Sequence, residues 1–242
     1  MIILQFDRAY FHWGLLMLQS LQLHEPHTSV LCNTVNLTDR QMSELNNAHA
    51  RVEVTNGISD NQTTREQMAA RKPFVMQHAM QHYPGQPWYA LLDADFLVRK
   101  PLEPLWSLLD DRPAALCITD GMENGKFYRW LLTPSGLVVV RRDAKRLIDC
   151  WAKWSRHDQP LYTIEPMAWY WDQITLAEAW TEAGVECAVI PMHIYGDEQL
   201  RPGAAIWSAN VPEKAEYYEL LSAEYRRQLD CGHAQDLAVL TR

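Results

Sequence analysis

Residues 88–97 read Trp-Tyr-Ala-Leu-Leu-Asp-Ala-Asp-Phe-Leu, and the interpretation of the whole chain depends on this stretch. An apolar run ends in two carboxylates, Asp93 and Asp95, after which apolar residues resume. Because side chains in a strand alternate between faces, Asp93 and Asp95 project the same way if the extended geometry persists. Adjacent carboxylates repel each other, and a divalent cation with oxygen ligands relieves that repulsion. The pattern indicates a Mg²⁺ or Mn²⁺ site, and the alternative is a solvated Asp-x-Asp turn at a strand end.

Short apolar runs alternate with helical patterns on both sides of this stretch. Strands are expected at 2–6, 30–32, 52–54, 88–92, 114–118, 137–140 and 185–190. Helices are expected at 11–23, 39–48, in a long stretch ending at 82, and at 102–110, 143–154, 171–182 and 212–229. Pro73 is expected to interrupt the long helix, since proline suits a first helical turn. The alternation predicts a three-layer α/β fold with a mostly parallel sheet, and we expect a single domain over 1–242 because no linker or repeat occurs.

The predicted sheet places acidic residues at one edge. In such sheets ligands bind beyond the carboxyl ends of the strands, where Asp7 follows the first strand and Asp93 ends a central one. Neither a G-x-G-x-x-G nor a G-x-x-x-x-G-K-[ST] motif occurs, so a Rossmann dinucleotide site and a P-loop are both unsupported.

Composition narrows the classes of partner. The chain has 242 residues, a formal net charge of -8 and no Lys/Arg-rich run, which makes nucleic acid a poor candidate. Its five cysteines are scattered without a C-x-x-C pair and are typical of core residues in a reducing compartment. No signal peptide or transmembrane segment is evident, so we expect a cytoplasmic protein.

Several motifs in order resemble those of the GT-A glycosyltransferases, most closely the glycogenin and galactinol synthase group. They are Lys72-Pro at a helix start, the Asp93-Ala-Asp95 strand end, Leu102-Glu-Pro-Leu-Trp, Pro134-Ser-Gly-Leu-Val-Val-Val, Trp171-Asp-Gln-Ile-Thr-Leu and His193-Ile-Tyr-Gly. The resemblance covers about residues 1–200 and is strongest over 72–106. The family's Lys-Pro-Trp after the late histidine is absent, and Gln199-Leu-Arg-Pro stands in that region.

The resemblance implies a GT-A-type fold and a metal-dependent, retaining hexosyltransferase that uses a nucleotide-sugar donor, with UDP the expected nucleotide. Asp93, Asp95 and His193 would hold Mn²⁺ (or Mg²⁺), and His233 is an alternative ligand. Imidazole is a softer ligand than carboxylate and suits Mn²⁺ better than Mg²⁺. Asp93 would also contact the donor. The donor sugar and the acceptor stay open.

Further roles follow from the same resemblance, each with a simpler alternative. Lys72 would contact the diphosphate, with Arg71 or Arg65 as substitutes, although all three also suit a solvated helix face. Asp7 would accept a hydrogen bond from the base or ribose, or is a plain turn residue. Tyr10 would stack on the base, or belongs to the core.

At the sugar end of the donor, Asp172 is the expected catalytic carboxylate and Gln173 would hydrogen-bond a sugar hydroxyl. As an acidic residue in the first turn of a helix, Asp172 also suits a capping role. Two other functions remain open: a sugar-phosphate nucleotidyltransferase, which usually has a Gly-rich basic loop after the first strand, and a nucleotide-sugar-binding protein without turnover.

Overall fold

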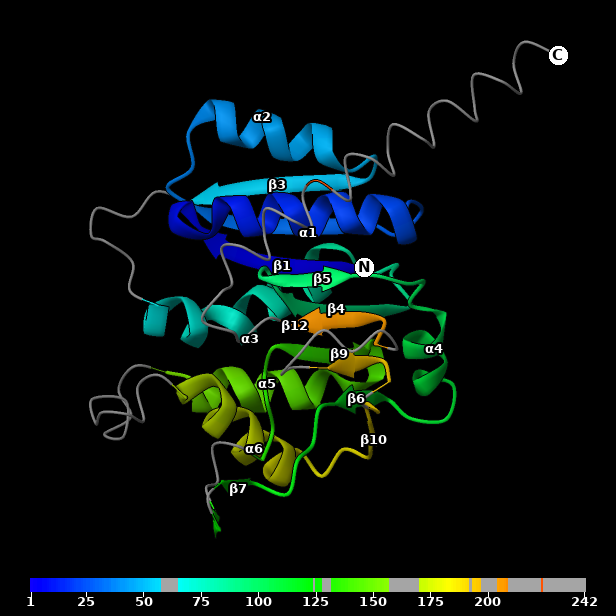
Figure 1. The fold of residues 1–242 in the computed structure, drawn as a ribbon. Helices are drawn as coiled ribbons and strands as arrows, with labels where there is room; N and C mark the ends of the chain where they lie inside the picture. Colours follow the sequence, from blue (N-terminus) through cyan, green and yellow to red (C-terminus); the bar gives the residue numbers. More distant parts are fainter. Residues whose placement is uncertain are drawn as a thin grey trace, which may run out of the picture.

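The computed structural model describes residues 1–57, 65–123, 125–127, 132–156, 170–191, 193–196, 204–208 and 223 (Figure 1). Its main sheet has seven strands in the order β10-β6-β9-β4-β1-β2-β3. Their bounds are β1 Ile2–Asp7, β2 Val30–Val35, β3 Val52–Gly57, β4 Trp88–Asp93, β6 Ala114–Leu116, β9 Leu137–Arg141 and β10 Cys187–Val189. All neighbours are parallel except β9, which runs antiparallel to both β4 and β6. The predicted mostly parallel α/β fold is confirmed.

Helices cover both faces of this sheet (Figure 1). They are α1 Phe11–His24, α2 Asp39–Ala48, α3 Arg65–His82, α4 Glu103–Trp106, α5 Lys145–Trp154 and α6 Trp171–Ala183, with short 3-10 turns η1 Arg8–Tyr10, η2 Ser107–Leu109 and η4 Arg142–Ala144. Alternation along β1 builds the two cores: Leu4 and Phe6 pack with α1, whereas Ile3 packs with α3. The described part thus has three layers, as the sequence predicts.

Two smaller sheets lie beside the main one. One contains β11 Tyr195–Gly196, β12 Ile206–Ser208 and β5 Phe96–Val98, and the other pairs β7 Met122–Glu123 with β8 Lys126–Phe127. Because β5 belongs to a different sheet from β4, the chain changes sheets between Asp93 and Phe96.

The expected interruption at Pro73 is wrong, because α3 continues from Arg65 to His82. Proline removes the N–H that would bond the Ala69 carbonyl, yet the helix is held by its buried face on the sheet, with Met76 in the core. One residue earlier, the Met68 carbonyl also accepts a hydrogen bond of 3.0 Å from the Gln5 side chain.

Other boundaries differ by a few residues. The strand expected at 52–54 continues through residue 57, because residues 55–57 pair in register with β2. The helix expected at 102–110 is α4 followed by η2, and the helix expected at 212–229 lies outside the described residues. The four cysteines in the described part form no disulfide. No helix there is both long enough and apolar enough to cross a membrane.

Candidate active site at the carboxyl edge of the sheet

The antiparallel strand β9 brings a loop to the carboxyl edge of the parallel strands. Asp93 ends β4, and its backbone N–H donates to the carbonyl of Gly136, immediately before β9, at 2.8 Å. Lys72 reaches this edge from α3 and Asp172 from the first turn of α6. Four separate segments of sequence therefore meet here.

Lys72 lies between two carboxylates. Its Nζ is 2.8 Å from Asp93 Oδ1 and 2.7 Å from Asp172 Oδ2, and its side chain is only 13% exposed. The hydroxyl of Ser135 donates to Asp172 Oδ2 at 2.6 Å and accepts from Lys72 Nζ at 3.4 Å. The alternative of a solvated helix face is therefore wrong for Lys72, whereas the neighbouring Arg71 is exposed.

Asp172 is fixed from several directions. It is 4% exposed, its Oδ1 accepts from the backbone N–H of Gln173 at 3.0 Å, and its carbonyl accepts from the indole of Trp151 at 3.1 Å. The side chain of Thr133 in turn donates to the Gln173 carbonyl at 3.0 Å. The Asp172 carboxylate thus accepts a helix-start N–H and also belongs to a buried ion-pair network.

Burial and charge act in opposite directions in this network. Burial alone would lower the pKa of Lys72, but the charges of Asp172 and Asp93, with their hydrogen bonds, raise it above its ordinary value. Burial raises the pKa of Asp93, and the nearby Asp95 raises it further, against the opposing effect of Lys72. Asp93 and Asp172 share the ammonium of Lys72, and Asp95 adds negative charge beside Asp93.

The extended geometry expected through Asp95 does not persist. Ala94 and Asp95 form a turn before β5 begins at Phe96, so alternation along one strand does not align the two carboxylates. They remain close enough for the charge of Asp95 to raise the pKa of Asp93. Hard carboxylate oxygens suit Mg²⁺ or Mn²⁺, so this donor set fits a divalent cation.

A third metal ligand is not assembled by the described residues. His193 is exposed and precedes β11. Across the described ranges, no group of three or more His, Cys, Asp or Glu side chains is close enough to share an ion, so His193 does not join Asp93 and Asp95 there. His233 lies outside the described residues.

The residues expected at the nucleotide end occupy the same edge. Asp7 ends β1, and its Oδ1 accepts from the backbone N–H groups of Ala9 at 2.9 Å and Tyr10 at 3.2 Å, which caps η1. Tyr10 is half-buried and packs against the core on the α1 side. Arg65 begins α3.

Two residues that sequence reasoning did not assign to the site support it. Ser135 is 1% exposed and bonds both Lys72 and Asp172. Gly136 has no room for a side chain, since a Cβ there would lie 2.8 Å from Asp93 Oδ2 and 2.6 Å from the Phe96 ring. The sequence feature that could have indicated these two residues is a Ser-Gly pair directly before an apolar strand. Assigning the pair to the site also required knowing that this strand runs antiparallel to β4.

No family model matches the sequence, and no curated protein is significantly similar to it. The arrangement of strands and helices is that of the GT-A-type fold, and the predicted fold class is confirmed by solved structures with the same arrangement.

Three such structures illustrate the likeness. The glycosyltransferase GlyE of Streptococcus pneumoniae TIGR4 matches with a TM-score of 0.63 and 13% identity, over 93% of this chain and 59% of GlyE. A glycosyltransferase involved in the glycosylation of the major capsid of PBCV-1 matches with a TM-score of 0.58 and 15% identity, over 91% and 98% of the two chains. The galactosyltransferase LgtC, in complex with donor and acceptor sugar analogs, matches with a TM-score of 0.50 and 14% identity, over 93% and 96%. This chain thus spans less than two thirds of GlyE.

Proposed function

We propose that this protein is a metal-dependent glycosyltransferase that moves a hexose from a UDP-sugar to an acceptor with retention of configuration. The observation that carries the proposal is the buried network of Lys72, Asp93 and Asp172 at the carboxyl edge of a GT-A-type sheet. Burying several charges together costs stability unless they are paired, and such networks concentrate at functional sites. That the solved structures of similar fold are glycosyltransferases gives independent support.

Charge balance supports the metal part of the proposal. Asp93 and Asp172 share the ammonium of Lys72, and a nucleoside diphosphate would bring further negative charge to the same edge. A divalent cation held by Asp93 and Asp95, with His193 or His233 as a further ligand, would offset this repulsion. When bound, the ion would act as a Lewis acid that neutralises the departing diphosphate.

The remaining roles follow from position and charge. The Asp172 carboxylate is held by Lys72 and Ser135. Its role would be to stabilise positive charge that develops at the anomeric carbon. Gln173, next in the chain, would orient a sugar hydroxyl. Lys72 would contact the diphosphate of the donor and would also keep Asp93 and Asp172 ionised. Asp7 and Tyr10 would contact the nucleoside.

The test uses the purified chain with Mn²⁺ and a panel of nucleoside-diphosphate sugars, followed by measurement of nucleoside diphosphate release. We expect release from one UDP-sugar, loss of release in EDTA and recovery with Mn²⁺. Lys145→Ala, which removes an exposed lysine, should retain full activity as a surface control.

The outcomes separate the alternatives. Pyrophosphate release from a nucleoside triphosphate and a sugar phosphate would identify a nucleotidyltransferase instead. UDP binding without any turnover of the donor panel would favour a binding protein. Full turnover after exhaustive chelation would refute the metal dependence but would still support a glycosyltransferase.

A further inference from the structure

A pocket lies at the opposite end of β4 from the candidate active site. Trp88 begins β4 and Asp93 ends it, so the two sites are separated by five residue steps, or about 17 Å along the strand. The pocket has a volume of about 320 Å³ and is lined by residues of β4, β9, α4 and η2 with their flanking positions. It takes no part in the proposed transfer reaction.

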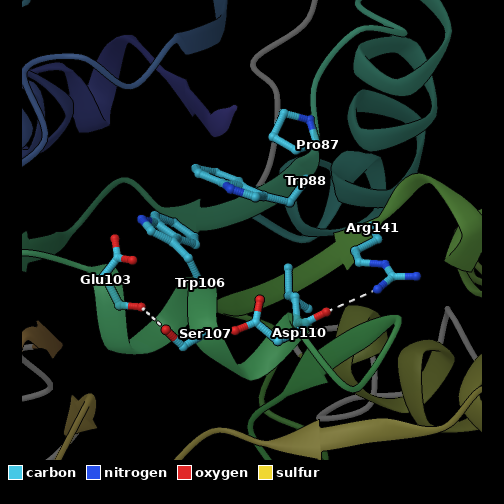
Figure 2. A pocket seen from close by; sticks show the side chains of 8 residues that line it. Pro87, Trp88, Glu103, Trp106, Ser107, Asp110 and Arg141 are labelled. Carbon is cyan, nitrogen blue, oxygen red and sulfur yellow. Dashed lines mark hydrogen bonds between the residues drawn. The ribbon is translucent and has the colours of Figure 1, made fainter.

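Two indoles form one wall of this pocket (Figure 2). Trp88 and Trp106 stack with ring centroids 3.7 Å apart and planes inclined by 13°. Both side chains are only half-buried, and stacking covers just one face of each ring. An aromatic wall of this kind attracts organic cations through the negative face of the ring.

The segment of α4 and η2 contributes two carboxylates, those of Glu103 and Asp110, to the lining of the pocket. Three lining residues lie three, four and seven positions after Glu103, namely Trp106, Ser107 and Asp110. This spacing places all four residues on one side of α4 and η2. In Figure 2 the side chains of Glu103 and Asp110 lie on either side of Ser107, on the segment that also carries Trp106. Each carboxylate is one helical turn from this ring.

The pocket's positive group is already engaged. Arg141 pairs with Asp143 and donates through Nη1 to the carbonyl of Leu109 at 3.2 Å, the contact drawn in Figure 2. Within the described residues, no ion pair or hydrogen bond involves the carboxylates of Glu103 and Asp110. The pocket therefore combines aromatic surface with two units of uncompensated negative charge.

We propose that this pocket binds a small alkylammonium ion, with Trp88 and Trp106 as the aromatic wall and Glu103 and Asp110 as the counter-charges. A cation near an aromatic ring gains from both the ring quadrupole and the carboxylates, whereas a neutral molecule of the same shape gains only from apolar contact.

Ligand-observed NMR with the full chain tests the charge requirement directly. The probes are choline, ethanolamine and 3,3-dimethylbutan-1-ol, in which carbon replaces the quaternary nitrogen of choline. We expect saturable binding of choline and ethanolamine and much weaker binding of the neutral alcohol. Equal binding of choline and its neutral analogue, or no saturable binding of either amine, would overturn the proposal.

Matched variants locate the binding. Glu103→Gln combined with Asp110→Asn keeps shape while removing charge, and should weaken choline binding roughly 2- to 30-fold. Trp106→Leu should weaken it to a similar extent. Asp111→Asn removes one charge just outside the pocket and should leave binding unchanged. Comparable losses in Asp111→Asn, or none in the double variant, would overturn the site.

A final arm separates this pocket from the candidate active site. UDP with Mn²⁺ should not displace choline, since the two ligands would occupy opposite ends of β4. Competitive displacement of choline by UDP would overturn the proposal, whereas failure of the glycosyltransferase assay would leave it intact.

Discussion

Lys72→Ala removes the ammonium between two carboxylates and tests whether the network is as buried as its contacts indicate. In the wild type the Lys72 side chain is 13% exposed and that of Asp172 is 5% exposed. Without Lys72, the Asp172 carboxylate loses its ion-pair partner in a nearly dry environment. The variant should therefore lose much more stability than removal of an ordinary surface lysine.

The expected loss follows from the contacts. At 2.7 Å and 2.8 Å, and with an effective dielectric constant of about 20, each ion pair contributes roughly 6 kcal/mol of gross Coulomb attraction. Desolvation of the charges offsets most of this, and the contact with Asp93 counts for less because that side chain is 34% exposed. Removing one partner of a buried ion pair typically costs about 3–5 kcal/mol, and we expect a loss at the lower end of that range.

Urea unfolding at neutral pH without metal measures this loss. The matched control is Lys145→Ala, which breaks an exposed pair with Asp149 on α5 and should cost about 0.5 kcal/mol or less. Adding Asp172→Asn to the Lys72 variant should recover part of the loss, because the uncompensated buried charge is then gone. The reasoning would be refuted if Lys72→Ala lost no more unfolding free energy than the control. It would also be refuted if the double variant were less stable than Lys72→Ala alone.

Three further predictions address neighbouring residues. Asp172→Asn should leave UDP affinity near wild type while donor turnover falls roughly 10²-fold or more, and normal turnover in the folded variant would contradict a role at the sugar end. Because burial raises the pKa of Asp93, its ionised form destabilises the metal-free fold. The wild type should then gain stability relative to Asp93→Asn as the pH falls from neutral toward 3.8, the ordinary pKa of an aspartate side chain. Urea titrations at several pH values that show the opposite trend would contradict this. Gly136→Ala places a Cβ 2.6 Å from the Phe96 ring and should cost about 1–3 kcal/mol, whereas Gly85→Ala meets nothing within 4 Å and should cost little; equal melting temperatures would refute the difference.

The fold was predictable because periodicity reports which faces of an element are buried. The nearly continuous apolar runs of β1 and β4 have the pattern of strands covered on both faces, and both strands lie in the central part of the sheet. Pro73 shows the limit of such reasoning, since a local rule about proline is overridden by the packing of α3 on the sheet.

The sequence predicted which residues form the site better than it predicted the contacts between them. Lys72 and Asp172 were both identified, but their ion pair joins positions 100 residues apart and depends on how α3 and α6 pack. The turn at Ala94 depends on where the chain leaves the main sheet for another, which local alternation does not encode. Ser135 belongs to a motif evident in the sequence, but its contacts with Lys72 and Asp172 depend on β9 running antiparallel to β4.

The separation of these segments also bears on how the protein folds. The pair of Lys72 and Asp172 closes across 100 residues, and that of Ser135 and Asp172 across 37. Contacts so distant in sequence form only after the chain has paid a large loop-closure entropy, so they belong to the late, slow part of folding. Partly folded chains with β1, β2 and β3 already paired would still lack the network. The proposed nucleotide binding would therefore require completed folding, and refolding kinetics followed by UDP binding should lag behind the recovery of helical circular dichroism.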